Sequence, residues 1–351
     1  MTMRPVVWNT IFFLLIFTVI FVLTRGLFTT EKLYEDDDQE GLNEQIVIRF
    51  SHVVAENTPK GLAAQRFAEI AHEKTNGRVR VEVFPNGSLF SDREEFSALL
   101  QNDIQMIAPS FSMIAEFAPE WAVFDLPFLF HDLAAVERAF VGEIGEHLLQ
   151  RLDRKGVQGL AFWNNGFKQM TSFQNPLIYP EDFKGQGFRV MPSWVIYEQF
   201  KLLNAKPVEI PFNEVYNSLE SFDVDGQENT ISNIYSRRLY ELQRYMTISN
   251  HGLLGYAVII NRDFWNSLPE DNQLQLTEAM IETTGWNAQN SKRMNSELLK
   301  QLEKNVDIEI HYLTEEEKKS WIEALQPVYQ VFKEKSDNDL IELVEKLHVN
   351  D

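Results

Sequence analysis

No cysteine occurs among the 351 residues of this chain. The absence excludes disulfide bonds, zinc–thiolate and iron–sulfur sites, catalysis by a thiol, and a lipid anchor attached through cysteine. Basic side chains are also few, because 32 lysines and arginines stand against 52 aspartates and glutamates, for a net charge of −20. A surface of that sign repels phosphate groups, so we expect no nucleic-acid partner.

The short motifs of common catalytic and nucleotide-binding sites are missing as well. The sequence contains no G-x-S-x-G, Walker A, G-x-G-x-x-G or H-E-x-x-H pattern. Its seven histidines form no close pair with the spacing of metal ligands. We therefore expect no cofactor and no metal, and a protein that binds a ligand rather than an enzyme.

One long apolar run stands near the N-terminus. Residues 11–23 (IFFLLIFTVIFVL) are interrupted only by a threonine, and they lie between Arg4 and Arg25. A helix of about 20 residues matches the hydrocarbon core of a bilayer. No A-x-A-like site follows, which favours an uncleaved anchor over a cleaved signal peptide, and both stay open. We expect residues 1–28 to be an anchor or signal and residues 29–45 an acidic tether, with the rest outside the cytoplasm.

Strand-like and helix-like segments alternate after the tether. Apolar or alternating runs at 46–50, 79–84 and 104–108 predict strands, and segments at 59–75 and 92–100 have helical spacing. This strand–helix–strand–helix–strand order favours a mostly parallel sheet with right-handed crossovers.

A second set of alternating elements begins after Gly156. The predicted elements are strands at 160–163, 187–191, 208–210 and 255–261, and helices ending near 203 and spanning 212–222, 269–304, 314–332 and 339–347. We expect the strand at 255–261 to return to the first sheet. The helix at 269–304 is unusually long for a globular protein.

Two open sheets and one long late helix predict an α/β fold with two lobes braced by a shared element. We expect lobe I to comprise residues 46–165 and 255–294, and lobe II to comprise residues 166–254 and 295–351.

Polar and charged residues follow several predicted strands, where ligands bind in open α/β sheets. Ser51 and His52 follow the first strand, with Lys60 at the next helix start, and Ser110 follows the third. Arg189 lies within an otherwise apolar strand and needs a partner. An internal ion pair and an anionic ligand are equally open interpretations of this arginine.

Six motifs in order, within residues 46–331, closely resemble the DctP-type solute-binding proteins of TRAP (tripartite ATP-independent periplasmic) transporters. They are FSHVV (50–54) leading into TPKG (58–61), FPNG (84–87), NGFKQ (165–169), DFKG (182–185) before FRV (188–190), FNEVY (212–216) and DGQEN (225–229). The resemblance implies a two-lobed fold like that of periplasmic binding proteins, with the N-terminal anchor in front.

The resemblance also implies a ligand-binding set, which is Arg189, Lys168, Asn229, Phe212, Lys60, His52 and Ser110. The arginine would form a bidentate ion pair with a ligand carboxylate, which suits guanidinium geometry. Lys168 would meet a second carboxylate, Asn229 would hydrogen-bond the ligand, and Phe212 would pack against it. The proline usual after the Glu-Asn of this motif is replaced here by Thr230.

Segments 36–41 (DDDQEG) and 53–57 (VVAEN) look like the C4-dicarboxylate-binding subgroup of Gram-positive bacilli. This likeness implies succinate, fumarate or malate as ligand and a TRAP membrane permease as partner. Two alternatives stay open: an accessory sensor that presents the dicarboxylate to a membrane histidine kinase or carrier, and a binder of another organic or sugar acid. The expected location is the cell membrane, with the binding domain on its outer face.

Overall fold

The computed structural model describes residues 45–305 and 307–349. The predicted anchor and all but the last residue of the predicted tether lie outside this range. The folded unit begins at Ile46. Within the described range, no helix combines the length and the apolar character needed to cross a bilayer.

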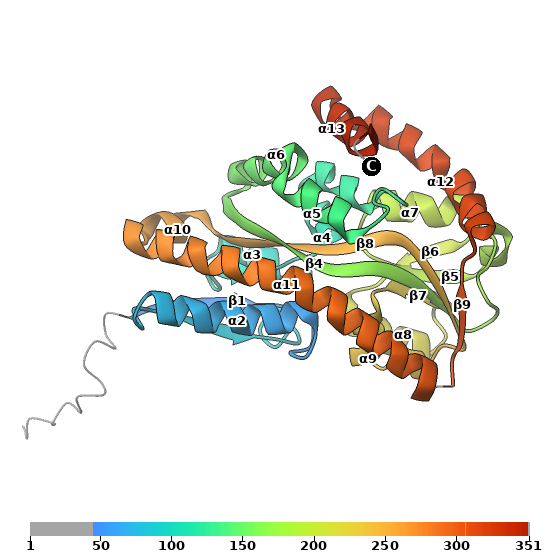
Figure 1. Cartoon of the computed structure of the whole chain (residues 1–351), viewed down its shortest axis with the longest axis horizontal. Helices are drawn as coiled ribbons and strands as arrows, with labels where there is room; N and C mark the ends of the chain where they lie inside the picture. Colours follow the sequence, from blue (N-terminus) through green and yellow to red (C-terminus); the bar gives the residue numbers. More distant parts are fainter. Residues whose placement is uncertain (1–44, 306, 350–351) are drawn as a thin grey trace, which may run out of the picture. The chain divides into compact units, whose positions relative to one another are not determined.

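A nine-stranded sheet organises the described part of the chain, in the order β2-β1-β3-β8-β4-β7-β5-β6, with β9 paired to β8 (Figure 1). The strands are β1 (Ile46–Ser51), β2 (Val79–Phe84), β3 (Met106–Ile107), β4 (Val157–Ser172), β5 (Gly187–Val190), β6 (Lys206–Glu209), β7 (Gly226–Asn229), β8 (Tyr245–Asn261) and β9 (Glu309–Tyr312).

Each end of the sheet is a group of three parallel strands. The first half consists of β2, β1 and β3, and the second half of β7, β5 and β6. The long strands β4 and β8 pair antiparallel between the two halves, from Val157↔Asn261 to Ser172↔Tyr245. The expected return of the strand at 255–261 to the first sheet is confirmed by the pairing of β8 with β3. The two separate sheets expected from the sequence are joined into one, because β4 and β8 continue far beyond their apolar runs.

The helices cover both faces of this sheet. They are α2 (Pro59–Lys74), α3 (Glu95–Leu100), α4 (Phe111–Ile114), α5 (Leu133–Val141), α6 (Glu143–Leu152), α7 (Trp194–Leu202), α8 (Val215–Glu220), α9 (Ile231–Ser236), α10 (Arg262–Ser267), α11 (Glu270–Asn305), α12 (Glu315–Lys335) and α13 (Asn338–Val349). Short 3₁₀ turns occur at Pro119–Asp125, Asp153–Lys155, Pro180–Phe183, Phe212–Glu214 and Leu239–Glu241. The sequence pattern does not predict α4, α5 or α6.

The long helix predicted at 269–304 is confirmed as α11, with 36 residues. It runs beside α2 and packs on β4 and α9 (Figure 1). Its polar side chains bond both the sheet and α9: Asn287 Oδ1 accepts the N–H of Asn164 in β4 at 3.0 Å, and Asn295 Oδ1 accepts the N–H of Ser232 in α9 at 2.9 Å. Helix α11 therefore contacts elements on both sides of the central strands.

Aromatic side chains fill much of the core. Phe111 of α4 packs against Phe124 with ring centroids 4.8 Å apart, and Phe140 stacks on Phe162 at 4.9 Å. Beneath α2 and α11, Phe50 packs against Phe67 and Trp163. These side chains are large and interlocked, so each supports the position of the strand or helix that carries it.

Candidate functional site

A small pocket of about 40 Å³ takes its lining from both halves of the sheet. The first half and its helices supply Lys60, Asp92, Glu95 and Ser110, while the second supplies Arg189, Phe212, Asn229 and Asn233. Leu254 and Tyr256 of the central strand β8 complete the lining. Four of its side chains are ionisable acids or bases of opposite sign, which is unusual for a structural cavity.

Arg189 enters the pocket from β5 and is only 2% exposed. Its Nε donates to the carbonyl of Ile210 at 2.9 Å, whereas Nη1 has no hydrogen-bond partner among the described residues. Burial lowers the pKa of Arg189 to about 10, opposed by the attraction of Asp92 and Glu228. The guanidinium stays charged at neutral pH, and no ion pair with it occurs in the described part of the chain. It thus offers an unpaired cationic donor at the pocket wall.

Lys60 is a second buried cation of the pocket. It lies in the first turn of α2, which Thr58 caps by accepting the N–H of Gly61. Its Nζ donates to the carbonyl of Ala108 at 2.9 Å and lies 3.9 Å from the ring centroid of Tyr256. Burial lowers the pKa of Lys60 to about 8, while Glu95 and Asp92 favour the charged form.

Two carboxyl groups face these cations. Glu95, at the start of α3, is 2% exposed and accepts a hydrogen bond of 2.7 Å from Ser51. Burial raises the pKa of Glu95 to about 7, although Lys60 and Ser51 oppose the rise. Asp92 accepts the N–H of Phe212 at 3.1 Å, which links the two halves. Sequence reasoning missed both acids, since nothing in a predicted helix at 92–100 marks which carboxyl group is buried.

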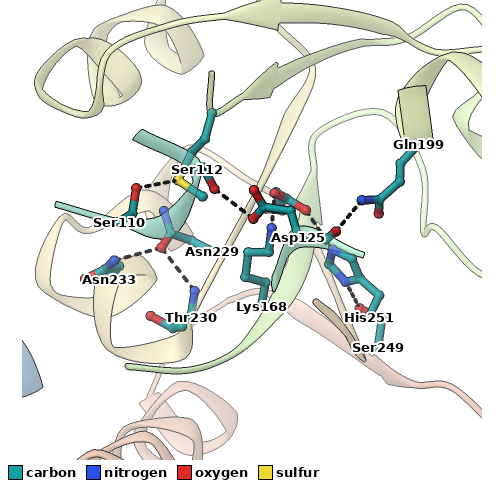
Figure 2. Close-up of polar contacts among 12 residues, drawn as sticks. Ser110, Ser112, Asp125, Lys168, Gln199, Asn229, Thr230, Asn233, Ser249 and His251 are labelled. Carbon is teal, nitrogen blue, oxygen red and sulfur yellow. Dashed lines mark hydrogen bonds and ion pairs between the residues drawn. The ribbon is translucent and has the colours of Figure 1, made fainter. Parts of the chain in front are cut away.

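Amide and hydroxyl groups form another wall. Asn229 Oδ1 accepts from Asn233 Nδ2 at 2.8 Å and from the N–H of Thr230 at 3.1 Å (Figure 2). A proline at position 230 has no N–H to give that bond. Ser110 caps α4, and its hydroxyl lies 4.0 Å from the sulfur of Met191.

Arg189, Asn229, Phe212, Lys60 and Ser110 are therefore brought together around one pocket. Lys168 and His52 are not among the residues that line it. The role of all seven as ligand contacts stays a prediction.

Lys168 instead lies in a buried polar cluster next to the pocket (Figure 2). Its Nζ is 2.5 Å from Glu228 Oε1, and Glu228 Oε2 is 2.7 Å from Nε2 of His251, whose Nδ1 contacts Ser249. Burial raises the pKa of the Glu228 carboxyl, but Lys168 and His251 outweigh it and hold that pKa at about 2. The cluster is an ion pair whose cation already has a partner.

His52 is fully buried in the core beside Phe50, whose ring it meets edge-on with centroids 6.3 Å apart. Burial, aided by the charge of Lys60, lowers the pKa of His52 to about 3. The ring is therefore neutral at physiological pH. No group of three or more histidine, aspartate and glutamate side chains gathers as a metal site in the described range.

Comparison with known proteins identifies a family. The family model of DctP, bacterial extracellular solute-binding protein family 7, matches residues 50–335. The chain is similar to the C4-dicarboxylate-binding protein DctB of Bacillus subtilis (strain 168), with 49% identity over 329 residues, 93% of this chain and 94% of that relative.

Solved structures show the same fold. A TRAP periplasmic solute binding protein from Shewanella oneidensis with bound succinate superposes with a TM-score of 0.83 and 41% identity, over 86% of this chain and 99% of that one. The sugar acid binding protein DctPAm from Advenella mimigardefordensis, in complex with galactonate, gives a TM-score of 0.85 and 30% identity, over 88% and 99% of the two chains.

Proposed function

This chain belongs to the bacterial extracellular solute-binding proteins of family 7, and from that membership we propose that it captures a C4-dicarboxylate such as succinate, fumarate or malate. It is a solute-binding protein outside the cytoplasm and not an enzyme. The ligand is chosen from the relatives, since the Bacillus subtilis protein is named for C4-dicarboxylates and the Shewanella structure holds succinate.

The observation that carries this proposal is the buried, unpaired Nη1 of Arg189. An uncompensated buried cation is costly, and a carboxylate that accepts from its planar fork removes the cost. The neighbouring amide of Asn229 and the ring of Phe212 belong to the same wall.

The second carboxylate of the ligand would meet Lys60. Lys60 lines the pocket together with Arg189, and among the described residues its ammonium group has no ion-pair partner. Lys168, by comparison, is engaged by Glu228. Lys168 would act from outside the pocket by holding Glu228, the residue next to Asn229.

Ligand entry requires the two halves to separate. The pocket volume of about 40 Å³ is far below the several hundred Å³ of typical ligand sites. A dicarboxylate that joins Arg189 of one half to Lys60 of the other would favour the closed form by its differential affinity. The lobes expected at 46–165 with 255–294 and at 166–254 with 295–351 stay a prediction.

The protein would pass its ligand to a TRAP membrane permease, the partner that TRAP-type relatives imply. The apolar run at 11–23 would tether it to the outer face of the membrane. Affinity purification of the full chain from its own cells checks this: co-purification of a permease supports transport, and co-purification of a histidine kinase alone contradicts it.

Isothermal titration of the full-length chain with succinate tests the ligand assignment. Replacement of Arg189 by Ala should weaken binding by about 2–5 kcal/mol, which is at least about thirtyfold, since a buried charge pair is lost. Arg189→Lys should recover little, because an ammonium lacks the guanidinium fork. Arg293→Ala, on the exposed face of α11, is the control and should bind like the unmodified protein. Near-wild-type affinity in Arg189→Ala would overturn the assignment.

A further inference from the structure

The positive and negative charges of the ionisable groups in the pocket cancel before any ligand enters. Counted in their ionised forms, Lys60 and Arg189 supply two positive charges, and Asp92 and Glu95 supply two negative ones. A C4-dicarboxylate dianion adds two more negative charges, so the occupied pocket would hold a net charge of −2. Because Arg189 and Glu95 are each 2% exposed, water screens this excess poorly. Titratable groups in such a site change their protonation state instead of remaining charged.

Glu95 is the acid best placed to take the proton. It is buried, whereas Asp92 is only partly buried and accepts the N–H of Phe212. The groups around Glu95 are Ser51 from β1, Lys60 from α2 and Asp92 from the preceding turn. His52, which follows β1, is neutral and does not line the pocket, whereas Arg189 on β5 lines the same pocket as Glu95.

The protonation of Glu95 is linked to that of Lys60, the cation next to it. Lys60 and Glu95 attract each other when charged, and each favours the charged form of the other in its buried position. Burial raises the pKa of Glu95 to about 7 and lowers the pKa of Lys60 to about 8, so both titrate close to neutral pH. Two carboxylates that approach from the ligand favour protonated forms of both groups.

On the basis of the proposed function, we propose that the Glu95–Lys60 pair takes up one proton from solvent when a dicarboxylate binds. Lys60 then meets the ligand as an ammonium group, and Glu95 lies beside it as a neutral carboxylic acid. No other bond is made or broken. Glu95 thereby removes one of the two excess negative charges of the occupied pocket, and binding becomes linked to pH.

The sign of this linkage follows from proton uptake. Binding that takes up a proton weakens as pH rises, and with a free-state pKa near 7 the affinity falls about fivefold from about pH 7 to about pH 8. This range lies above the pKa values of the carboxyl groups of free succinate, so the ligand itself stays a dianion.

Calorimetric titration of the full-length chain with succinate at about pH 7.5 tests the uptake. In two buffers with different ionisation enthalpies, the observed heats should differ by the amount expected for the uptake of about half a proton or more. Equal heats in both buffers, with succinate bound, would overturn the proposal and leave the proposed function intact. Absence of dicarboxylate binding would overturn the proposed function and this inference with it.

Difference infrared spectroscopy with ¹³C-labelled succinate identifies the group that holds the proton. A carbonyl band of a protonated carboxyl group should appear on binding in the unmodified protein, disappear in Glu95→Gln and remain in Asp92→Asn. A band that survives in Glu95→Gln, or that disappears in Asp92→Asn alone, would contradict the assignment. The unmodified protein suffices to test whether any such band forms, should the Gln variant fail to fold.

Discussion

The cluster of Lys168, Glu228 and His251 is the most deeply buried group of charges in the described part of the chain. Desolvation of such charges costs several kcal/mol, and close contacts of 2.5 and 2.7 Å offset that cost only while both partners are present. Glu228 directly precedes Asn229 on β7, and Asn229 lines the pocket. The ion pair therefore positions a wall of the pocket.

Replacement of Lys168 by Met should lower the free energy of unfolding by about 3–5 kcal/mol, because Glu228 loses its main counter-charge. Urea unfolding followed by circular dichroism measures this loss. Lys319→Met is the matched control: it breaks an exposed pair with Glu323 at 3.8 Å and should cost no more than about 0.5 kcal/mol. Equal losses in both variants would show that the buried pair is not a stabilising element.

Acid titration supplies an independent check of the same pair. The folded-state pKa of Glu228, about 2, lies below its ordinary value of 4.5, so its stabilisation is complete above about pH 4.5 and is lost as pH falls towards 2. His251 acts in the same direction, because burial lowers its pKa below the ordinary value, although Glu228 opposes this shift. Glu228→Gln should therefore flatten the acid branch of the stability profile.

Individual residues show where sequence reasoning stops. An arginine in an apolar strand could be identified as a site candidate without any structure, since its charge has no local partner. The ion pair of Lys168 could not, because Glu228 is 60 residues away along the chain and meets it only across β4 and β7. The burial of Glu95 could not be predicted for the same reason, because it depends on α2 and β1, which are distant from Glu95 in the sequence.

At the scale of elements, β8 and α4 approach each other closely in the core. Gly255 of β8 leaves no space for a side chain, because an added Cβ would lie 2.3 Å from Cε2 of Phe111. Phe111 is 2% exposed and is surrounded by Trp121, Phe124 and Phe162, so its ring cannot move aside. The glycine therefore sets the distance between the central strand and the aromatic core.

Gly255→Ala should destabilise the fold by about 1–3 kcal/mol through overpacking. Gly285→Ala on α11 is the matched control, since nothing lies within 4 Å of its added Cβ. There, alanine should stabilise the helix by about 0.4–1 kcal/mol. Thermal unfolding of both variants measures whether each substitution stabilises or destabilises the protein. A stabilised Gly255→Ala would mean that the ring of Phe111 moves aside.

Helices and strands can be predicted from the sequence where the apolar pattern is local. They cannot be predicted where the buried side chains are polar. Helix α11 was predicted within a residue at each end. Strand β4 was predicted only at 160–163, yet it continues to Ser172, because its later polar residues find partners elsewhere in the fold. Asn164 bonds α11, Lys168 bonds β7, and Gln169 Nε2 donates to Asn250 at 2.7 Å. A hydropathy pattern gives no information on such hydrogen bonds between distant residues.

For the whole molecule, the two parallel halves share β4, β8 and α11, so a ligand at the proposed site between the halves would act on all of them. Binding to the folded state alone stabilises a protein by about 2.7 kcal/mol when the ligand is at 100 times its Kd. Succinate at that excess should raise the unfolding free energy of the full chain by this amount, and that of Arg189→Ala by no more than about 0.9 kcal/mol, because the Kd of the variant is at least about thirtyfold higher. Denaturant titration with and without succinate measures the difference, and equal stabilisation of both proteins would place the ligand away from Arg189.

The position of β8 in the sheet also determines when the pocket can form during folding. β8 lies between β3 and β4, and it supplies Leu254 and Tyr256 to the pocket. A chain that is threaded through a membrane from its N-terminus has delivered most of both halves before the strand that unites them emerges. A chain that emerges from its N-terminus therefore completes the lining of the pocket only once Tyr256 has joined the sheet.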